Sequence, residues 1–198
     1  GESGVGKSAL LGRFAEEVRA TEPAALVLAA RCYEREAVPY KAVDGAMDAL
    51  ARHLRSLDEQ ALRSMLPPGA ELLATLFPAF GWVPGAAPEA RRPQVLEALE
   101  LRQRVFSTLR RLLRAVAQRG PLVLLLDDLQ WTDGDSLALL RELLRPPEAP
   151  ALLLVAARRP RDPGSSAADD LAALAAPERR LRLAPLLPQE AGELARRL

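Results

Sequence analysis

The sequence predicts an α/β fold in which a parallel β-sheet lies between two layers of helices. Three features of the 198-residue chain lead to this prediction. Short aliphatic runs alternate with longer helical segments, which favours a parallel sheet with crossover helices. A glycine-rich opening runs directly into a helix, and two acidic residues follow the most apolar of the aliphatic runs.

The chain opens on the residues GESGVGKS, which fit the pattern G-x-x-x-x-G-K-[ST] of a phosphate-binding P-loop. Glycine permits the positive φ angles with which backbone N–H groups wrap a phosphate chain. We expect Lys7 to reach the β- and γ-phosphates and the hydroxyl of Ser8 to bind Mg²⁺. The predicted phosphate-binding residues are Gly1, Glu2, Ser3, Gly4, Val5, Gly6, Lys7 and Ser8.

A helix is predicted over residues 8–20, because the loop of a P-loop must lead into a helix whose N-terminal amides face the anion. Its apolar residues recur at helical spacing and define one face, made of Leu10, Leu11, Phe14 and Val18. Residues 24–30 follow as a buried parallel strand, and residues 32–40 as a loop. The single cysteine, Cys32, is expected to be a small buried residue at the end of that strand.

The next part of the chain predicts a largely helical insert over about residues 41–93. Apolar spacing indicates helices over residues 41–57, 58–65 and 70–77. Residues 78–93 contain four prolines and two glycines, which predicts a loop. A long helix is then predicted over residues 94–118. Its arginines could form a binding stripe, although a solvated helix face is the more common role; they are Arg102, Arg104, Arg110, Arg111 and Arg114.

The last third of the chain again alternates strands with helices. Residues 122–128 read LVLLLDD, which is typical of a central strand that delivers carboxylates at its C-terminal end. The remaining predictions are a helix over 135–145, strands over 151–157 and 180–184, and helices over 169–176 and 189–198.

The two acids complete a nucleotide site. Asp127 stands where a P-loop protein needs a carboxylate for its magnesium ion, opposite Ser8. Adjacent strand residues point to opposite sides, so Asp128 has a separate task, and it is the candidate to orient or deprotonate the attacking water. A purely structural role for both acids as a strand-to-turn cap is the alternative. Arg158 or Arg159, after the next strand, could contact the γ-phosphate, although an ordinary basic loop is an equal alternative.

Together with the P-loop, the stretches RCYEREAVPYKA (31–42) and LDDLQWTD (126–133) resemble AAA-type ATPase domains of the origin-recognition-like class. These domains belong to the STAND P-loop NTPases and occur in large bacterial signalling proteins, beside a Ser/Thr kinase domain or LuxR-type or cyclase domains. The resemblance implies ATP and Mg²⁺ as cofactors, Asp127 as the metal carboxylate and Arg159 or Arg158 as a sensor. Asp128 stands where many relatives have a longer glutamate, which implies slow hydrolysis.

The resemblance also implies a domain organisation. Residues 1–187 are expected to form the ATPase domain without the strand that precedes the P-loop in this family, and residues 188–198 to begin a following helical segment. That strand lies centrally in the family's sheet, so the isolated piece is expected to be marginally stable. The implied partners are ATP, other domains of the same polypeptide such as a kinase domain, and further copies that associate in a nucleotide-dependent way.

Composition limits the other functional classes. A net charge of +1 argues against a nucleic-acid-binding surface, and the chain has no long apolar span and no signal peptide, so a cytoplasmic location is expected. No protein-kinase signature is present. The alternatives to a slow ATPase are a nucleotide-binding scaffold without turnover, a DNA-remodelling ATPase and, remotely, a small-molecule kinase. Adenine is preferred over guanine by the resemblance and by the lack of an Asn-Lys-x-Asp element.

Overall fold

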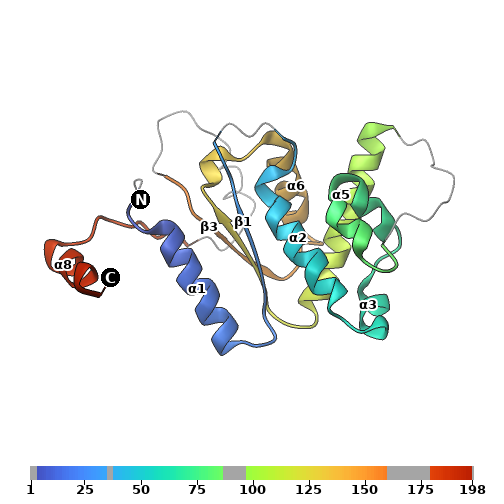
Figure 1. The fold of residues 1–198 in the computed structure, drawn as a ribbon. Helices are drawn as coiled ribbons and strands as arrows, with labels where there is room; N and C mark the ends of the chain where they lie inside the picture. Colours follow the sequence, from blue (N-terminus) through green and yellow to red (C-terminus); the bar gives the residue numbers. More distant parts are fainter. Residues whose placement is uncertain (1–3, 35–37, 87–96, 160–178, 198) are drawn as a thin grey trace.

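The computed structural model describes residues 4–34, 38–86, 97–159 and 179–197. The elements, with η marking a 3-10 helix, follow in the order α1 (Lys7–Thr21), β1 (Leu26–Arg31), α2 (Lys41–Arg55), α3 (Glu59–Met65), η1 (Ala70–Leu72), α4 (Leu73–Leu76), η2 (Pro78–Trp82), α5 (Ala98–Ala117), β2 (Leu122–Asp127), η3 (Leu129–Trp131), α6 (Gly134–Leu144), β3 (Leu152–Ala156) and α8 (Pro188–Arg197). The sheet lies between α1 on one side and α2, α5 and α6 on the other (Figure 1).

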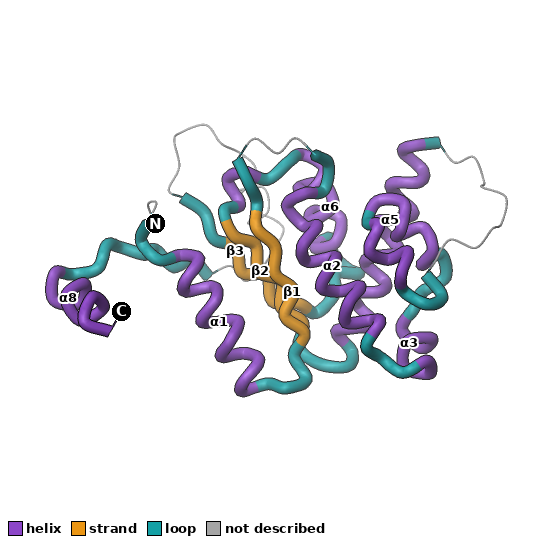
Figure 2. The backbone as a smooth tube through the Cα atoms, viewed as in Figure 1, coloured by secondary structure: helices purple, strands orange, loops and turns teal. Residues whose placement is uncertain are grey.

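The described strands form a parallel sheet in the order β1-β2-β3 (Figure 2). Leu26 pairs with Leu122, which pairs with Leu152, so the strands run in register and end at the same edge of the sheet. The aliphatic residues of the central strand β2 are all buried, as an uninterrupted aliphatic run predicts. The predicted α/β fold with helices on both faces is confirmed.

The two faces of the sheet bury very different amounts of apolar surface. On one face, residues of β1 and β2 pack with α2, α5, α6 and the insert into a large core that includes Phe77, Phe80 and Leu109. On the other face, α1 covers a small cluster. Ala15 is the one residue of α1 that is buried in it, among the residues described. Leu10 was predicted on the packed face of this helix, but it is 49% exposed. The α1 layer is therefore held by far less apolar contact.

The predicted loop over residues 78–93 is wrong for its first part. Pro78–Trp82 forms the 3-10 helix η2, with proline at its start, where a missing N–H costs nothing. Phe80, Val83 and Ala86 are each 0% exposed and belong to the large core. Burial of these apolar side chains outweighs the loop tendency of the prolines and glycines around them. Residues 87–93 lie outside the described residues.

The predicted strand over residues 180–184 is also wrong. Residues 179–187 contain neither helix nor strand, and Leu181 is 72% exposed. A strand exists through hydrogen bonds to a neighbouring strand, and none of the described strands pairs with this segment. The alternating pattern alone therefore does not produce a strand here. The helix predicted over residues 169–176 lies outside the described residues.

Two of the five arginines of α5 depart from the predicted solvated face, whereas Arg104, Arg111 and Arg114 are exposed as predicted. The side chain of Arg110 is only 14% exposed, and its guanidinium contacts Glu142 at 3.0 Å and Glu148 at 2.9 Å. Arg102 contacts Asp135 at 2.9 Å, and Arg104 contacts Glu100 at 2.7 Å. These side chains are used within the fold, where two of them join α5 to α6 and to the segment after it. This intramolecular use weakens the alternative of a binding stripe.

Candidate nucleotide site

The glycine loop leads into α1 as the P-loop pattern requires. Gly4 and Gly6 have φ angles of 81° and 88°, in the left-handed region that favours glycine. A Cβ at either position would meet no atom within 4 Å, so backbone conformation, and not space, selects glycine here. Gly6 is the N-cap residue, and α1 begins at Lys7 with no side-chain cap and no acid in its first turn. Gly1, Glu2 and Ser3 lie outside the described residues.

The first turn of α1 meets the end of the central strand. The hydroxyl of Ser8 donates a 2.5 Å hydrogen bond to Oδ2 of Asp127, across a separation of 119 residues in the chain. Ser8 belongs to the start of α1, and Asp127 is the last residue of β2. The other carboxylate oxygen of Asp127 accepts a 2.9 Å hydrogen bond from the backbone N–H of Asp128. The residues predicted to hold magnesium are thus brought together.

Asp128 leaves the strand and turns away from Asp127. Its φ and ψ angles are 55° and 41°, a left-handed conformation, so it caps η3 and does not continue β2. Its Oδ2 accepts hydrogen bonds from Arg31 at 3.2 and 3.0 Å, and its Oδ1 accepts one from Gln130 at 2.9 Å. Arg31 also lies 4.0 Å from Oδ2 of Asp127, so the two acids share this cation. Of the two acids, Ser8 contacts only Asp127 and Gln130 only Asp128 among the contacts described. The cause of this difference is the turn, since the alternation of side chains along a strand ends at Asp127.

The sequence assigned no role to Arg31 or to Gln130, although both hold Asp128. Arg31 is the last residue of β1, and its register partner in the sheet is Asp127. The available signal was a basic residue at the end of one strand together with an acidic pair at the end of another. The pairing of the two strands was needed to use it. For Gln130 the sequence contains no comparable signal, because its contacts depend on the fold of η3.

The segment after β3 joins the site through its backbone. The N–H of Arg159 donates a 3.1 Å hydrogen bond to the side-chain oxygen of Gln130, while the residue itself is exposed. Arg158 is half-buried. The N–H of Leu129 adds a 2.9 Å hydrogen bond to the carbonyl oxygen of Ala157. The ends of β2 and β3 are thus tied together beside the predicted metal residues.

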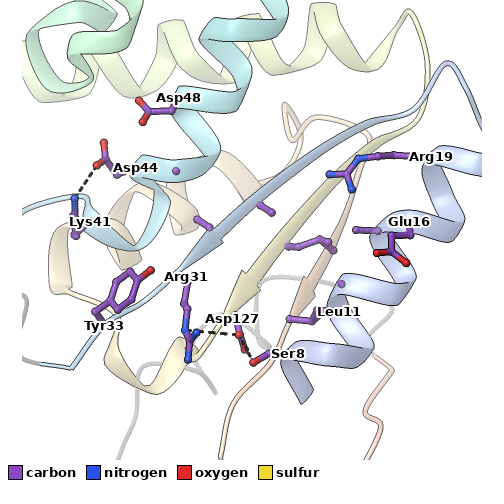
Figure 3. Close-up of a pocket in the computed structure, with 16 residues that line it drawn as sticks. Ser8, Leu11, Glu16, Arg19, Arg31, Tyr33, Lys41, Asp44, Asp48 and Asp127 are labelled. Atoms are coloured by element: carbon purple, nitrogen blue, oxygen red, sulfur yellow. Dashed lines mark hydrogen bonds and ion pairs between the residues drawn. The ribbon is translucent and has the colours of Figure 1, made fainter. Parts of the chain in front are cut away.

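A cleft of about 670 Å³ opens beside these residues, between α1 and α2. Figure 3 shows Ser8 and Asp127 at one end, with Leu11, Glu16 and Arg19 from α1 on one wall and Asp44 and Asp48 from α2 on the other. Ala29 and Ala30 of β1 contribute a small-residue floor. Acidic and basic groups both line the cleft, and Lys41 contacts Asp44 at 3.0 Å. The site is therefore accessible from a cavity that can admit a small molecule.

Comparison with known protein families decides the family. The model of the AAA ATPase domain matches residues 1–155, which include the glycine loop, both acids and most of the sheet. The chain belongs to the AAA ATPase domain family. This membership implies nucleotide binding and hydrolysis as the general activity of the domain. Comparisons with curated proteins and with solved structures found no significant match.

The donor atoms of this AAA ATPase domain fit a magnesium ion. Ser8 and Asp127 supply a hydroxyl and a carboxylate oxygen in contact, which are the hard oxygen ligands that Mg²⁺ prefers. Within the described residues no group of three or more His, Cys, Asp or Glu side chains could enclose a metal. The oxygen pair of Ser8 and Asp127 suits Mg²⁺, which is commonly held by one or two protein ligands together with water and substrate phosphates.

A third acid, Asp133, organises the domain around the site and was not identified from the sequence. Its carboxylate accepts hydrogen bonds from the N–H and the hydroxyl of Ser136 at 2.7 and 2.5 Å, which cap α6. It also accepts from the N–H groups of Tyr40 and Ala42 at 3.2 and 3.4 Å, at the start of α2. Burial alone would raise the pKa of Asp133, but these hydrogen bonds outweigh it and lower the pKa below the ordinary value. One carboxylate thus fixes two helix N-termini.

Cys32, next to the site, has a buried thiol with a raised pKa. It is 2% exposed, as predicted for a buried residue at a strand end. Burial, together with the charges of Asp133, Asp128 and Asp127, raises the pKa of its thiol to about 12. Because the thiolate is the reactive form, this raised pKa leaves little reactive thiolate at neutral pH. Among the described helices, none has the length and apolar content needed to cross a membrane.

Proposed function

We propose that this AAA ATPase domain binds ATP with Mg²⁺, hydrolyses it slowly, and acts as a nucleotide-dependent switch in a multidomain bacterial signal-transduction protein. The observation that carries the proposal is the 2.5 Å contact between Ser8 and Asp127. It joins a hydroxyl at an uncapped helix N-terminus to a carboxylate at a strand end, beside an open cleft. ATP with Mg²⁺ needs both features, because the helix start binds its phosphates and the oxygen pair binds its metal ion.

The residues receive separate roles. Lys7 and the backbone of residues 1–8 bind the phosphates, and Ser8 and Asp127 hold the magnesium ion. When bound, Mg²⁺ neutralises charge on the β- and γ-phosphates. In hydrolysis the water oxygen bonds to the γ-phosphorus, the bond to the bridging β–γ oxygen breaks, and the water proton passes to the Asp128 carboxylate. Arg158 or Arg159 contacts the γ-phosphate and responds to its loss.

Slow turnover is supported by the contacts of Asp128. Both of its carboxylate oxygens accept hydrogen bonds, from Arg31 and from Gln130. A general base must lie within hydrogen-bond reach of the water that it deprotonates, so Asp128 has to loosen its ion pair with Arg31. Aspartate is also one methylene shorter than glutamate, which shortens its reach. Each turnover therefore includes a rearrangement at the strand ends.

The same contacts favour a second candidate function, a nucleotide-binding scaffold without turnover. In that case Asp128 serves only to join the ends of β1 and β2 through Arg31. The substitution Asp128→Asn separates the two functions. It should abolish hydrolysis and leave ATP affinity within about twofold if Asp128 is the base, and should change neither property appreciably in a scaffold.

The first experiment measures Mg²⁺-dependent ATP binding and turnover in a chain that carries additional residues before Gly1, so that a strand can form beside β3. Lys7→Ala should remove binding and turnover. Arg63→Ala is the matched control, because it also deletes one positive charge, from an exposed pair on α3 far from the cleft. Binding with slow turnover supports the switch, and binding alone supports the scaffold. A folded protein that does not bind ATP refutes both.

Domain organisation forms part of the proposal. We assign residues 1–187 to the ATPase domain and residues 188–198 to the start of a following helical segment. The outer edge of β3 supports a further strand in the sheet, because β3 pairs only with β2 among the described strands and Leu153 is 51% exposed. Other domains of the same polypeptide, such as a Ser/Thr kinase domain, and further copies of the chain are the proposed partners.

A further inference from the structure

Side chains connect the ends of the described strands across the C-terminal edge of the sheet. Arg31, at the end of β1, donates two hydrogen bonds to Oδ2 of Asp128, which follows β2. Gln130, in η3, donates a 2.9 Å hydrogen bond to Oδ1 of the same carboxylate. The side-chain oxygen of Gln130 accepts a 3.1 Å hydrogen bond from the N–H of Arg159, just after β3. Gln130 is thus the side chain that bridges the acidic residue and the arginine segment.

The amide of Gln130 can make this bridge in one orientation only. Its NH₂ group faces a carboxylate, which can only accept, and its oxygen faces a backbone N–H, which can only donate. A flipped amide would lose both hydrogen bonds, because its oxygen would face the Asp128 carboxylate and its NH₂ group would face the Arg159 N–H. The 3-10 helix η3 holds the residue in place, with Trp131 N–H bonded to Asp128 O at 3.0 Å and Leu129 N–H bonded to Ala157 O at 2.9 Å.

This geometry makes the Asp128 carboxylate sensitive to the backbone at Arg159. A displacement of that backbone either pulls Gln130 with it or breaks the hydrogen bond between them. In both cases the balance on Asp128 changes, because Arg31 competes for the same carboxylate from the other side with a full positive charge. The side chain of Asp128 is only 14% exposed, so water is a weak replacement for a lost protein partner.

We propose that Gln130 is a positioning residue that couples the arginine segment after β3 to the Asp128 carboxylate, an inference that rests on the proposed ATPase function. In the presence of Gln130 the carboxylate is shared between two partners. Without Gln130, Arg31 alone holds it at the β1 side and turnover falls. Nucleotide affinity stays within about twofold, because the hydrogen bonds of Gln130 go to Asp128 and Arg159 and not to Ser8 or Asp127.

The test compares kcat with ATP affinity, the latter measured separately with a fluorescent ATP analogue and Mg²⁺. Gln130→Ala should lower kcat about tenfold and leave affinity within about twofold. Gln130→Glu keeps the acceptor for Arg159 N–H but replaces the donor to Asp128 with a like charge, and should lower kcat at least as much. The matched control is Gln60→Glu, the same charge change at an exposed position of α3, which should alter neither quantity.

A second pair of variants tests the coupling itself. Arg159→Pro removes the backbone N–H, whereas Arg159→Ala keeps it and removes only the side chain. The kcat of Arg159→Pro divided by that of Arg159→Ala should equal the kcat of Gln130→Ala divided by that of the wild type. Adding Gln130→Ala to Arg159→Pro should lower kcat no further than Arg159→Pro alone. Unchanged kcat in Gln130→Ala, a parallel loss of affinity, or multiplying effects in the combination would each overturn the proposal.

A readout without turnover keeps the two proposals distinguishable. Hydrogen exchange of the Arg159 amide is followed by NMR in the nucleotide-free protein. Asp128→Ala removes the partner that orients Gln130 and should speed exchange at Arg159, and the effect should vanish in a Gln130→Ala background. Equal acceleration in both backgrounds refutes the coupling. A folded wild type without ATP binding refutes the proposed function, while the exchange result still decides the role of Gln130.

Discussion

Asp133 offers the sharpest test of how the site is held, because one substitution there should loosen two helices. Replacing it with alanine removes the acceptor for four donors: the N–H and hydroxyl of Ser136, and the N–H groups of Tyr40 and Ala42. A helix cap contributes about 1 kcal/mol, and each further hydrogen bond about the same. The bond to Ala42 is long at 3.4 Å, and Ser136 Oγ offers that N–H a second acceptor at 3.2 Å. Asp133→Ala should therefore lower the free energy of unfolding by about 3 kcal/mol.

Asp58 is the matched control for this substitution. It also caps a helix, α3, but it accepts a single 2.7 Å hydrogen bond, from Ala61 N–H, at an exposed position. Asp58→Ala should cost only about 1 kcal/mol. The assay is urea denaturation followed by circular dichroism, with the slopes of the two variants compared to exclude a change in the unfolded state. Equal losses from the two substitutions would refute the reasoning that Asp133 fixes α2 as well as α6.

The pH dependence provides a second, independent check on Asp133. Its pKa in the folded protein lies below the ordinary value of 3.8, so the folded state binds its proton more weakly than the unfolded state. The stabilisation is therefore complete above that ordinary value and is lost as the pH falls through the lower, folded-state pKa. Asp133→Asn, which cannot ionise, should show a smaller loss of stability on acidification than the wild type. An identical loss in both proteins would contradict the assignment.

Three further predictions concern the surrounding fold. A Cβ on Gly120 would lie 2.4 Å from a backbone carbonyl oxygen, so Gly120→Ala should cost about 1–3 kcal/mol in chemical denaturation, while Gly134→Ala, with no atom within 4 Å, should be close to neutral. The thiol of Cys32, with a pKa raised to about 12, should not react with a disulfide reagent at neutral pH until the protein is unfolded in urea; rapid reaction of the native protein would argue against its burial. The side chain of Arg110 is 14% exposed and pairs with both Glu142 and Glu148, so Arg110→Ala should lower the melting temperature by several degrees. Arg104→Ala breaks only an exposed pair within α5 and should change the melting temperature little.

Local patterns were enough to predict most elements of the fold. The apolar spacing of α2 predicts a helix, and the aliphatic run of β2 predicts a strand. Both predictions hold because burial of those side chains stabilises the same conformation that their spacing favours. The two wrong predictions have a common cause. Residues 78–86 were interpreted from local composition and residues 180–184 from local alternation. The core contacts of Phe80 decided the first conformation, and no described strand pairs with the second segment.

The site divides in the same way. A glycine loop that requires positive φ, a lysine and a serine at a helix start, and an acid at the end of an apolar strand each carry their chemistry in the sequence, since a short segment defines each of them. The sequence therefore determined the P-loop pattern and the proposal of Ser8 and Asp127 as the metal pair.

Only the tertiary structure could reveal the contacts that control Asp128. The hold of Arg31 depends on the register between β1 and β2, and the bridge of Gln130 depends on a left-handed turn at Asp128 and on the position of β3. Asp133 accepts a hydrogen bond at the start of α2 from the N–H of Tyr40, which is 93 residues away in the chain. Such contacts join groups from segments distant in the chain, and their geometry is fixed by the packing of whole strands and helices, which no local pattern encodes.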